Sequence, residues 1–220
     1  MRTLVVAPHP DDETLGVGGT IARKSKEGND LVWLIMTAIS EKDGWDRDKV
    51  SGRQVEIQRV SEILGIHQVV QLNYPTTKLD LVPLPELISS ISNVLSSYVP
   101  DEIYIPHPSD IHSDHKRTYE SVVSSAKWFR SSSIKRIYAY ETLSETGMDS
   151  INPAQFNPNF FVNIESELNT KIKSMQVYES EIRDFPFPRS EEAILALARI
   201  RGAQAGFKAA EAFQLLKEVY

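Results

Sequence analysis

A short apolar strand that ends in a dense polar cluster limits the fold of this chain more than any other feature. Residues 4–7 are Leu-Val-Val-Ala, an apolar and β-branched run that is typical of a buried parallel strand. The next six residues, Pro8 to Glu13, hold one imidazole and three carboxyl groups. Glycines and a helical pattern follow over residues 15–27. Because open α/β sheets bind ligands at the carboxyl ends of their strands, this order predicts a polar site after the first strand.

Apolar runs and amphipathic stretches alternate along the rest of the chain, which predicts alternating strands and helices. We expect further strands over residues 31–37, 69–72, 102–105, 134–140 and 160–164. We expect further helices over residues 54–64, 86–98, 116–129 and 166–180, and a last helix over 193–206 or two pieces that end near residue 219. Polar or proline-containing stretches over residues 38–50, 74–84 and 144–159 are predicted to be loops.

This alternation predicts a single domain over residues 1–220, of α/β class, with one doubly wound, mainly parallel, Rossmann-like sheet and helices on both faces. In the common strand order 3-2-1-4-5, the first and fourth strands are neighbours. A second polar cluster, His112-Ser113-Asp114-His115, follows the fourth strand. The topology therefore predicts that the two clusters meet, although about a hundred residues separate them.

Composition narrows the class of protein. The chain has 24 Lys and Arg against 30 Asp and Glu, a net charge of −6, and no block rich in Lys and Arg, so no nucleic-acid partner is expected. The absence of cysteine excludes disulfides, cysteine nucleophiles and thiolate zinc sites. No apolar run approaches the ~20 residues of a transmembrane helix, and the first residues do not resemble a signal peptide. We therefore expect a soluble, cytoplasmic protein.

The two clusters together hold the ligand types of a catalytic metal site, in which imidazoles and carboxylates bind the ion and one position stays open to water. The candidate ligands are His9, Asp11, Asp12, His112, Asp114 and His115. Adjacent side chains tend to point apart, so one can bind the metal while its neighbour acts as a general base. A histidine that is not a ligand can protonate a leaving amine or stabilise an oxyanion. These parts suit hydrolysis of an amide or ester, without showing which aspartate has which role.

Other residues in and near the clusters are open to structural interpretations. Glu13 either begins a helix, where the helix dipole favours a carboxylate, or supports the site through a hydrogen bond. His107, between two prolines, is a weaker candidate, either for a hydrogen bond that supports a site residue or for a substrate contact. The glycines of residues 16–19 lack dinucleotide-binding spacing and are interpreted as close packing at the helix start. Trp128 and Phe129 are predicted to lie in the core.

Several motifs resemble one known family. Pro8-His9-Pro10-Asp11-Asp12-Glu13, followed by Gly18-Gly19-Thr20, resembles the first signature of the PIG-L/LmbE-type zinc-dependent N-acetyl-sugar deacetylases. His112-Ser113-Asp114-His115 is similar to the second motif of that family, H-x-D-H. Weaker matches lie at Arg53-Gln54-Val55-Glu56 and within residues 201–213. The resemblance spans about residues 3–213, and the single predicted domain would be an LmbE-like deacetylase domain.

The resemblance implies a role for each residue around the metal. His9, Asp12 and His115 would be the ligands of a zinc ion. Asp11 would be the general base for attack by a zinc-bound water. The implied cofactor is Zn²⁺, although imidazole and carboxylate ligands also accept Fe²⁺ or another divalent ion.

The resemblance also implies residues that act on the substrate. His112, oriented by Asp114, would be the general acid or would stabilise the oxyanion, and Arg53 would contact the substrate. Residues 39–49 lack the Gly-Glu-Leu-type stretch of the family members that act in thiol biosynthesis. The identity of the sugar conjugate therefore stays open.

The implied function is removal of an N-acetyl group from an N-acetylglucosamine-like substrate, a small-molecule sugar conjugate. Two alternatives are an amidase of a non-sugar N-acyl compound and a non-catalytic metal- or sugar-binding protein. The non-catalytic alternative is disfavoured because Asp11, His112 and Asp114, which turnover needs, are all present. Members of the family often form oligomers, so a homo-oligomer is also considered.

Overall fold

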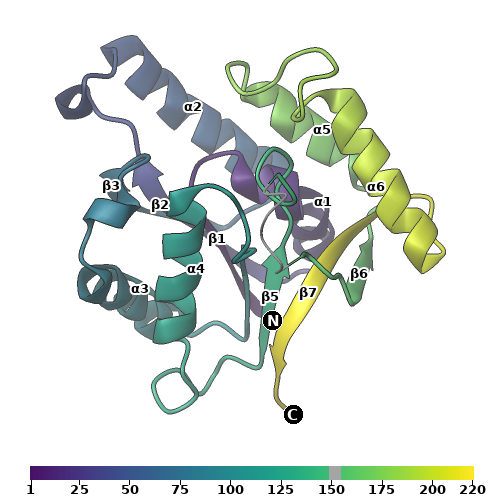
Figure 1. The fold of residues 1–220 in the computed structure, drawn as a ribbon. Helices are drawn as coiled ribbons and strands as arrows, with labels where there is room; N and C mark the ends of the chain where they lie inside the picture. Colours follow the sequence, from purple (N-terminus) through teal and green to yellow (C-terminus); the bar gives the residue numbers. More distant parts are fainter. Residues whose placement is uncertain (149–154) are drawn as a thin grey trace.

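The computed structural model describes residues 1–148 and 155–220, which form one seven-stranded sheet between two layers of helices (Figure 1). The strands are Arg2–Ala7 (β1), Asp30–Ala38 (β2), Gln68–Pro75 (β3), Glu102–Pro106 (β4), Arg136–Tyr140 (β5), Phe160–Asn163 (β6) and Ala210–Glu218 (β7). The α-helices are Asp12–Lys26 (α1), Arg47–Leu64 (α2), Leu84–Tyr98 (α3), Ser113–Ser125 (α4), Leu168–Val177 (α5) and Glu191–Ala205 (α6). Short 3₁₀ helices lie at Glu41–Asp43 and Leu79–Leu81. Of the helices in the described ranges, none is long and apolar enough to cross a membrane.

The sheet has the strand order β3-β2-β1-β4-β5-β7-β6. The first five strands are parallel, and β7 runs antiparallel to both of its neighbours, β5 and β6. Strand β1 lies between β2 and β4, with Leu4 opposite Val32 on one side and Ile103 on the other. The predicted α/β class, the doubly wound topology and the neighbouring positions of the first and fourth strands are therefore confirmed.

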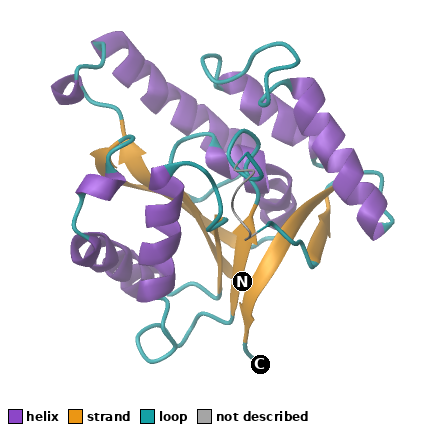
Figure 2. Cartoon of the chain, in the orientation of Figure 1, coloured by secondary structure: helices purple, strands orange, loops and turns teal. Residues whose placement is uncertain are grey.

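Helices cover both faces of the sheet, as Figure 2 shows in purple against the orange strands. On one face, Val5 and Ala7 of β1 pack in a core with residues of α1, α2, α5 and α6. On the other face, Leu4 and Val6 pack with residues of α3 and α4. Alternate side chains of a strand point to opposite faces, so β1 must be apolar throughout to fill both cores. This requirement explains the uninterrupted apolar run before the first polar cluster.

The glycines at the start of α1 allow the close packing that the sequence indicates. A Cβ atom at Gly16 would overlap the ring of Tyr140 in β5. A Cβ atom at Gly19 would overlap Ile164, which follows β6. These glycines therefore let α1 lie directly against β5 and against the residue that follows β6.

The helical prediction for the last part of the chain was wrong beyond residue 206. Residues 210–218 form β7, which fills the position between β5 and β6. This stretch is rich in Ala, Glu, Leu and Lys, which favour helices, but pairing with two strands overrides that local preference. Helix α2 also begins earlier than expected, at Arg47, because the Asp46 side chain accepts a hydrogen bond from the backbone N–H of Asp48. The predicted loop over residues 38–50 is therefore wrong at its end.

Two further predictions concern the connections. Trp128 and Phe129 are 73% and 61% exposed, so their placement in the core was wrong. They lie in the turn that follows α4, where the chain returns across the surface to β5.

Of the predicted loop over residues 144–159, residues 149–154 lie outside the described part. Its described ends, 144–148 and 155–159, contain turn or irregular structure, in agreement with the prediction.

Candidate active site

The two polar clusters meet at the carboxyl ends of β1 and β4. The ring centroid of His9, just after β1, lies 4.7 Å from that of His112 and 5.5 Å from that of His115. His112 precedes α4 and His115 lies in its first turn. The structure therefore brings together residues from the two motifs because their strands are neighbours in the sheet.

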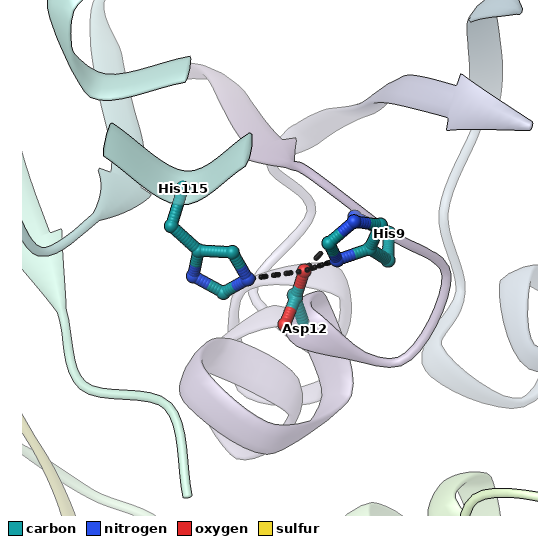
Figure 3. Close-up of side chains that lie close together, drawn as sticks. All are labelled: His9, Asp12 and His115. Carbon is teal, nitrogen blue, oxygen red and sulfur yellow. Dashed lines mark hydrogen bonds and ion pairs between the residues drawn. The ribbon is translucent and has the colours of Figure 1, made fainter. Parts of the chain in front are cut away.

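Three of the predicted ligands form a compact group that could hold a metal ion. One donor atom from each of His9, Asp12 and His115 lies within 4.8 Å of the others. Asp12 Oδ2 is 3.3 Å from His9 Nδ1 and 3.3 Å from His115 Nε2 (Figure 3). Burial acts to raise the pKa of Asp12, but His115 and His9 outweigh it and hold the pKa below its usual value. Two imidazoles and one carboxylate are a donor set of catalytic zinc sites.

A second group, His9, His112 and Asp114, meets the same spacing. Atoms of this group that could bind a metal ion already accept hydrogen bonds from the backbone. The Asp114 carboxylate accepts backbone N–H groups from Thr77 at 2.7 Å and Leu79 at 3.0 Å. His112 Nδ1 accepts the backbone N–H of Asp114 at 3.1 Å. We therefore take the group that contains Asp12 as the candidate metal site.

Each of the two imidazoles in the metal site has a buried carboxylate on its other nitrogen. Asp114 Oδ2 lies 2.9 Å from His9 Nε2, and Asp110 Oδ2 lies 2.8 Å from His115 Nδ1. A carboxylate only accepts hydrogen bonds, so in the neutral rings these nitrogens carry the protons and the nitrogens near Asp12 have lone pairs. Asp110 was missed in the sequence, although it lies two residues before the second cluster, because the direction of its side chain depends on the turn before α4. The carboxylate of Asp114 contacts His9, whereas the resemblance implied that it orients His112.

His112 presents an N–H group to the site. It is the N-cap residue of α4, and its Nδ1 atom accepts the backbone N–H of Asp114. In the neutral ring the proton is therefore on Nε2. Burial lowers the pKa of His112, and the neighbouring His9 and His115 lower it further. The structure thus favours a neutral imidazole that donates a hydrogen bond.

Asp11 lies beside the metal site in a strained backbone conformation. Its φ is 128°, a value rarely adopted by residues other than glycine, which costs on the order of 1–3 kcal/mol. Glu13 Oε2 accepts the backbone N–H of Asp11 at 3.0 Å, and Tyr178 donates to Glu13 Oε1 at 2.9 Å. Glu13 therefore supports the site through the backbone of Asp11. Burial and the charge of Asp12 raise the pKa of Asp11, and Arg189 acts to lower it.

These residues line a cavity of about 460 Å³, which is within the range for small-molecule sites. The lining includes His9, Asp11, Asp12, His112, His115, Arg53, Glu181 and Arg189. Glu181 and Arg189 come from the connection between α5 and α6 and were missed, because no motif marks that connection. His107 is not among the described residues that line the cavity. It is buried and bonds to Ser109 and Gln214, so its predicted substrate contact is not supported.

Comparison with known proteins adds to this geometry. A family model described as PIG-L, GlcNAc-PI de-N-acetylase, matches residues 4–126, more than half of the chain. The chain belongs to the PIG-L family. The resemblance drawn from the motifs is therefore confirmed. The matched range of this PIG-L protein contains the metal site but not Glu181 or Arg189.

The sequences of known relatives align with most of this PIG-L protein. It is 27% identical to the uncharacterized deacetylase YaiS of Escherichia coli over an alignment of 183 residues. This alignment covers 80% of this chain and 90% of YaiS. It is 24% identical to the diacetylchitobiose deacetylase of Thermococcus kodakarensis over an alignment of 234 residues. This alignment covers 100% of this chain and 84% of that relative. The crystal structure of the conserved protein TT1542 from Thermus thermophilus is 27% identical, with a TM-score of 0.80 over 99% of this chain and 96% of that one. The fold of TT1542 thus matches nearly the whole of this chain.

Proposed function

We propose that this PIG-L protein is a metal-dependent deacetylase that removes the N-acetyl group from an N-acetylglucosamine-like sugar conjugate. The observation that carries the proposal is the position of Asp11 and His112 beside the His9–Asp12–His115 group in one cavity. The name of the T. kodakarensis relative, a diacetylchitobiose deacetylase, supports an acetylated sugar as the substrate.

We propose Zn²⁺ as the cofactor, held by His9, Asp12 and His115. Two imidazole nitrogens and one carboxylate oxygen fit this ion and leave a position for a further ligand. The same donors accept Fe²⁺ or another divalent ion, so the metal must be identified by analysis of the purified protein. When bound, the ion lowers the pKa of a coordinated water and polarises a carbonyl oxygen.

Asp11 is the proposed general base. A water oxygen forms a bond to the carbonyl carbon of the N-acetyl group, and the Asp11 carboxylate accepts the proton that the water loses. The C–N bond then breaks and the same proton passes to the nitrogen. The products are a free amine and acetic acid, which releases its remaining proton to solvent and becomes acetate. This role suits Asp11 because its side chain lies outside the three-donor group, where Arg189 Nη1 contacts it at 3.4 Å.

His112 is the proposed stabiliser of the developing negative charge on the carbonyl oxygen. Its Nδ1 atom accepts a backbone N–H, so Nε2 is the nitrogen that remains for the substrate. A neutral ring donates one hydrogen bond from Nε2 without losing its proton. Of the two roles open to His112, the contacts support the stabiliser rather than the general acid.

The charged side chains in the cavity favour a neutral substrate. Arg53 lies between Glu181 Oε1 at 2.6 Å and Glu56 Oε2 at 3.3 Å. A guanidinium that is already paired with carboxylates gains little from a phosphate, whereas sugar hydroxyls can donate to and accept from such a network. We therefore propose that Arg53 belongs to the substrate-binding wall, and that the ring near the metal is an uncharged sugar.

Further expectations from the sequence remain part of the proposal. These are a single LmbE-like domain over residues 1–220, a cytoplasmic location and a homo-oligomeric state. An amidase of non-sugar N-acyl compounds remains the alternative activity.

Release of acetate from a panel of N-acetylated compounds tests the proposed function. The zinc-loaded protein is mixed with N-acetylglucosamine, its disaccharide, a glycoside of it, N-acetylcyclohexylamine and N-acetyl amino acids. We expect acetate from the sugars and much less from the other compounds. Acetate from the non-sugar amides alone would establish the amidase. No turnover of any compound by a protein with bound metal would favour the binding protein.

A further inference from the structure

One wall of the cavity is built by residues beyond the range that the family model matches. Residues 178–190 connect α5 to α6, and Glu181 and Arg189 of this segment line the cavity. Glu181 joins two arginines, with its Oε1 atom 2.6 Å from Arg53 Nη2 and its Oε2 atom 3.2 Å from Arg189 Nη2. Arg189 Nη1 lies 3.4 Å from Asp11 Oδ2. Contacts therefore run without a break from α2 to the proposed base.

All three nitrogens of Arg53 already have oxygen partners. Nη1 donates to the carbonyl of Pro10 at 3.3 Å, and Nε lies 3.3 Å from Glu56 Oε2. Nη2 contacts Glu181 and Ser180. The guanidinium also lies 5.6 Å from the ring centre of Tyr178. Arg53 is therefore held on several sides, and its donors are mostly committed to the protein.

Arg189 has donors to spare. A guanidinium carries five N–H groups. Two of the nitrogens of Arg189 have partners, Asp11 and Glu181, and its Nε atom has no hydrogen-bond partner among the described residues. Each Nη atom carries two hydrogens, so both can also donate to a ligand. Because Arg189 contacts the proposed base, such a ligand atom lies close to the bond that is cleaved.

We infer that Arg189 is the substrate-binding arginine, and that it donates a hydrogen bond to a hydroxyl on a carbon next to the one that bears the N-acetyl group. This inference rests on the proposed function and deepens it. A vicinal hydroxyl is the polar group of an amino sugar that lies closest to its amide, so it falls within reach of a side chain that contacts Asp11. Glu181 and Arg53 are positioning residues, because Glu181 contacts Arg189 and Arg53 contacts Glu181.

The test combines a change in the enzyme with a change in the substrate. We compare kcat/KM for N-acetylglucosamine and for its 1-deoxy and 3-deoxy analogues in the zinc-loaded wild type and in Arg189→Met. The wild type should prefer the parent sugar to one of the analogues by on the order of 10- to 100-fold, the value of a hydrogen bond to a charged group. In Arg189→Met that preference should disappear. An indirect effect through Asp11 would instead lower the rates of all three substrates by the same factor.

Arg183→Met is the matched control. Arg183 lies in the same segment and packs on the same ring, 5.3 Å from the centre of Phe187 against 5.4 Å for Arg189, but it is not among the described residues that line the cavity. This variant should keep the wild-type preference, and Glu181→Gln should lose part of it. If folded Arg189→Met and Arg189→Lys both keep the full preference for the parent sugar, the inference is wrong and the proposed function stands. A wild type that hydrolyses only non-sugar amides overturns both.

Discussion

Asp110 Oδ2 lies 2.8 Å from Nδ1 of His115, on the ring nitrogen that does not face Asp12. Both residues are buried, and the second oxygen of the carboxylate is held by the hydroxyl of Thr146 at 2.6 Å. The carboxylate therefore fixes the orientation of the ring and leaves Nε2 free to bind a metal ion.

Replacement of Asp110 should weaken metal binding. We expect the dissociation constant for Zn²⁺ to rise by roughly 10- to 100-fold in Asp110→Ala, with a smaller rise in Asp110→Asn. Competition with a coloured chelator measures this constant without any assay of activity. Glu145→Gln is the control, because Glu145 lines the same cavity without a hydrogen bond to a ligand ring. An unchanged constant in folded Asp110→Ala would show that the contact does not orient His115.

Single substitutions should separate the metal ligands from the proposed base. His9→Ala, Asp12→Ala and His115→Ala should each lose most of the bound ion, because each removes one of three donors. Asp11→Asn should keep the ion and lose kcat by roughly 10²- to 10⁴-fold. Metal content per protein and kcat, measured on the same samples, test both statements. Metal loss in Asp11→Asn with full retention in Asp12→Ala would reverse the roles.

Metal binding should release protons and weaken as the pH falls. Burial acts to lower the pKa of His9, but its hydrogen bonds with Asp114 and Asp12 outweigh this effect and raise the pKa to about 9. In the protein without metal the ring is therefore protonated at neutral pH, and an ion must displace that proton. Because the pKa of His9 is raised in the folded protein, the protonated ring stabilises the folded, metal-free state. This contribution is fully present below the unfolded pKa of 6.5 and is lost as the pH rises through about 9.

Calorimetric titration with Zn²⁺ in buffers of different ionisation enthalpy counts the released protons. We expect proton release at neutral pH that falls as the pH rises through about 9, where His9 loses its own proton. The buffer dependence should fall in Asp114→Asn, which loses one of the charges that hold the proton on His9. Equal heats in all buffers at neutral pH would contradict the prediction.

A buried ion pair should stabilise the junction between α1, α5 and β7. Lys171 Nζ lies 2.6 Å from Glu211 Oε1 and donates to the carbonyl of Leu15 at 2.7 Å. Glu211 also accepts the backbone N–H groups of Gly19 and Thr20. Lys171→Met leaves a buried carboxylate without its cation, so we expect a loss of about 3–5 kcal/mol in the free energy of unfolding. Urea denaturation measures this loss.

The control for this pair is an exposed one that also involves α1. Glu27→Gln removes the charge that pairs with Arg23, where both side chains are about half exposed, and should change the free energy of unfolding by less than about 1 kcal/mol. A similar small loss in Lys171→Met would mean that water solvates Glu211 once the lysine is gone.

The meeting of the two polar clusters, which forms the candidate metal site, could be predicted from the sequence because its parts obey local rules. Apolar runs mark β1 and β4, and the cluster after each run contains the ligand types, so the neighbouring strands alone bring His9 close to His115. The role of Asp110 could not be predicted, because the direction of a carboxylate depends on the three-dimensional course of the turn before α4. The strand β7 was missed because its residues favour helices, and only pairing with β5 and β6 makes them extended.

The substrate wall could not be predicted for a different reason. Glu181 and Arg189 lie in a connection without periodicity or motif. Their side chains form ion pairs with Arg53 of α2 and with Asp11 only because the segment folds back against them. Arg53 was predicted from a family motif, but its pairing with Glu181 and Glu56 depends on that same return of the chain.

The connection over residues 178–190 carries Glu181 and Arg189 of the cavity on a segment other than the strands that carry the candidate metal ligands. The candidate metal ligands stand at the ends of β1 and β4, whereas Glu181 and Arg189 stand on a segment that meets this region through the contacts of Arg189 with Asp11 and of Tyr178 with Glu13. Substitutions in this segment can therefore alter which amide enters the cavity while the ligand geometry is kept. If the proposed role of Arg189 holds, substitution of Glu181 and Arg189, with Tyr178 kept in contact with Glu13, is the direct route to a deacetylase of new selectivity.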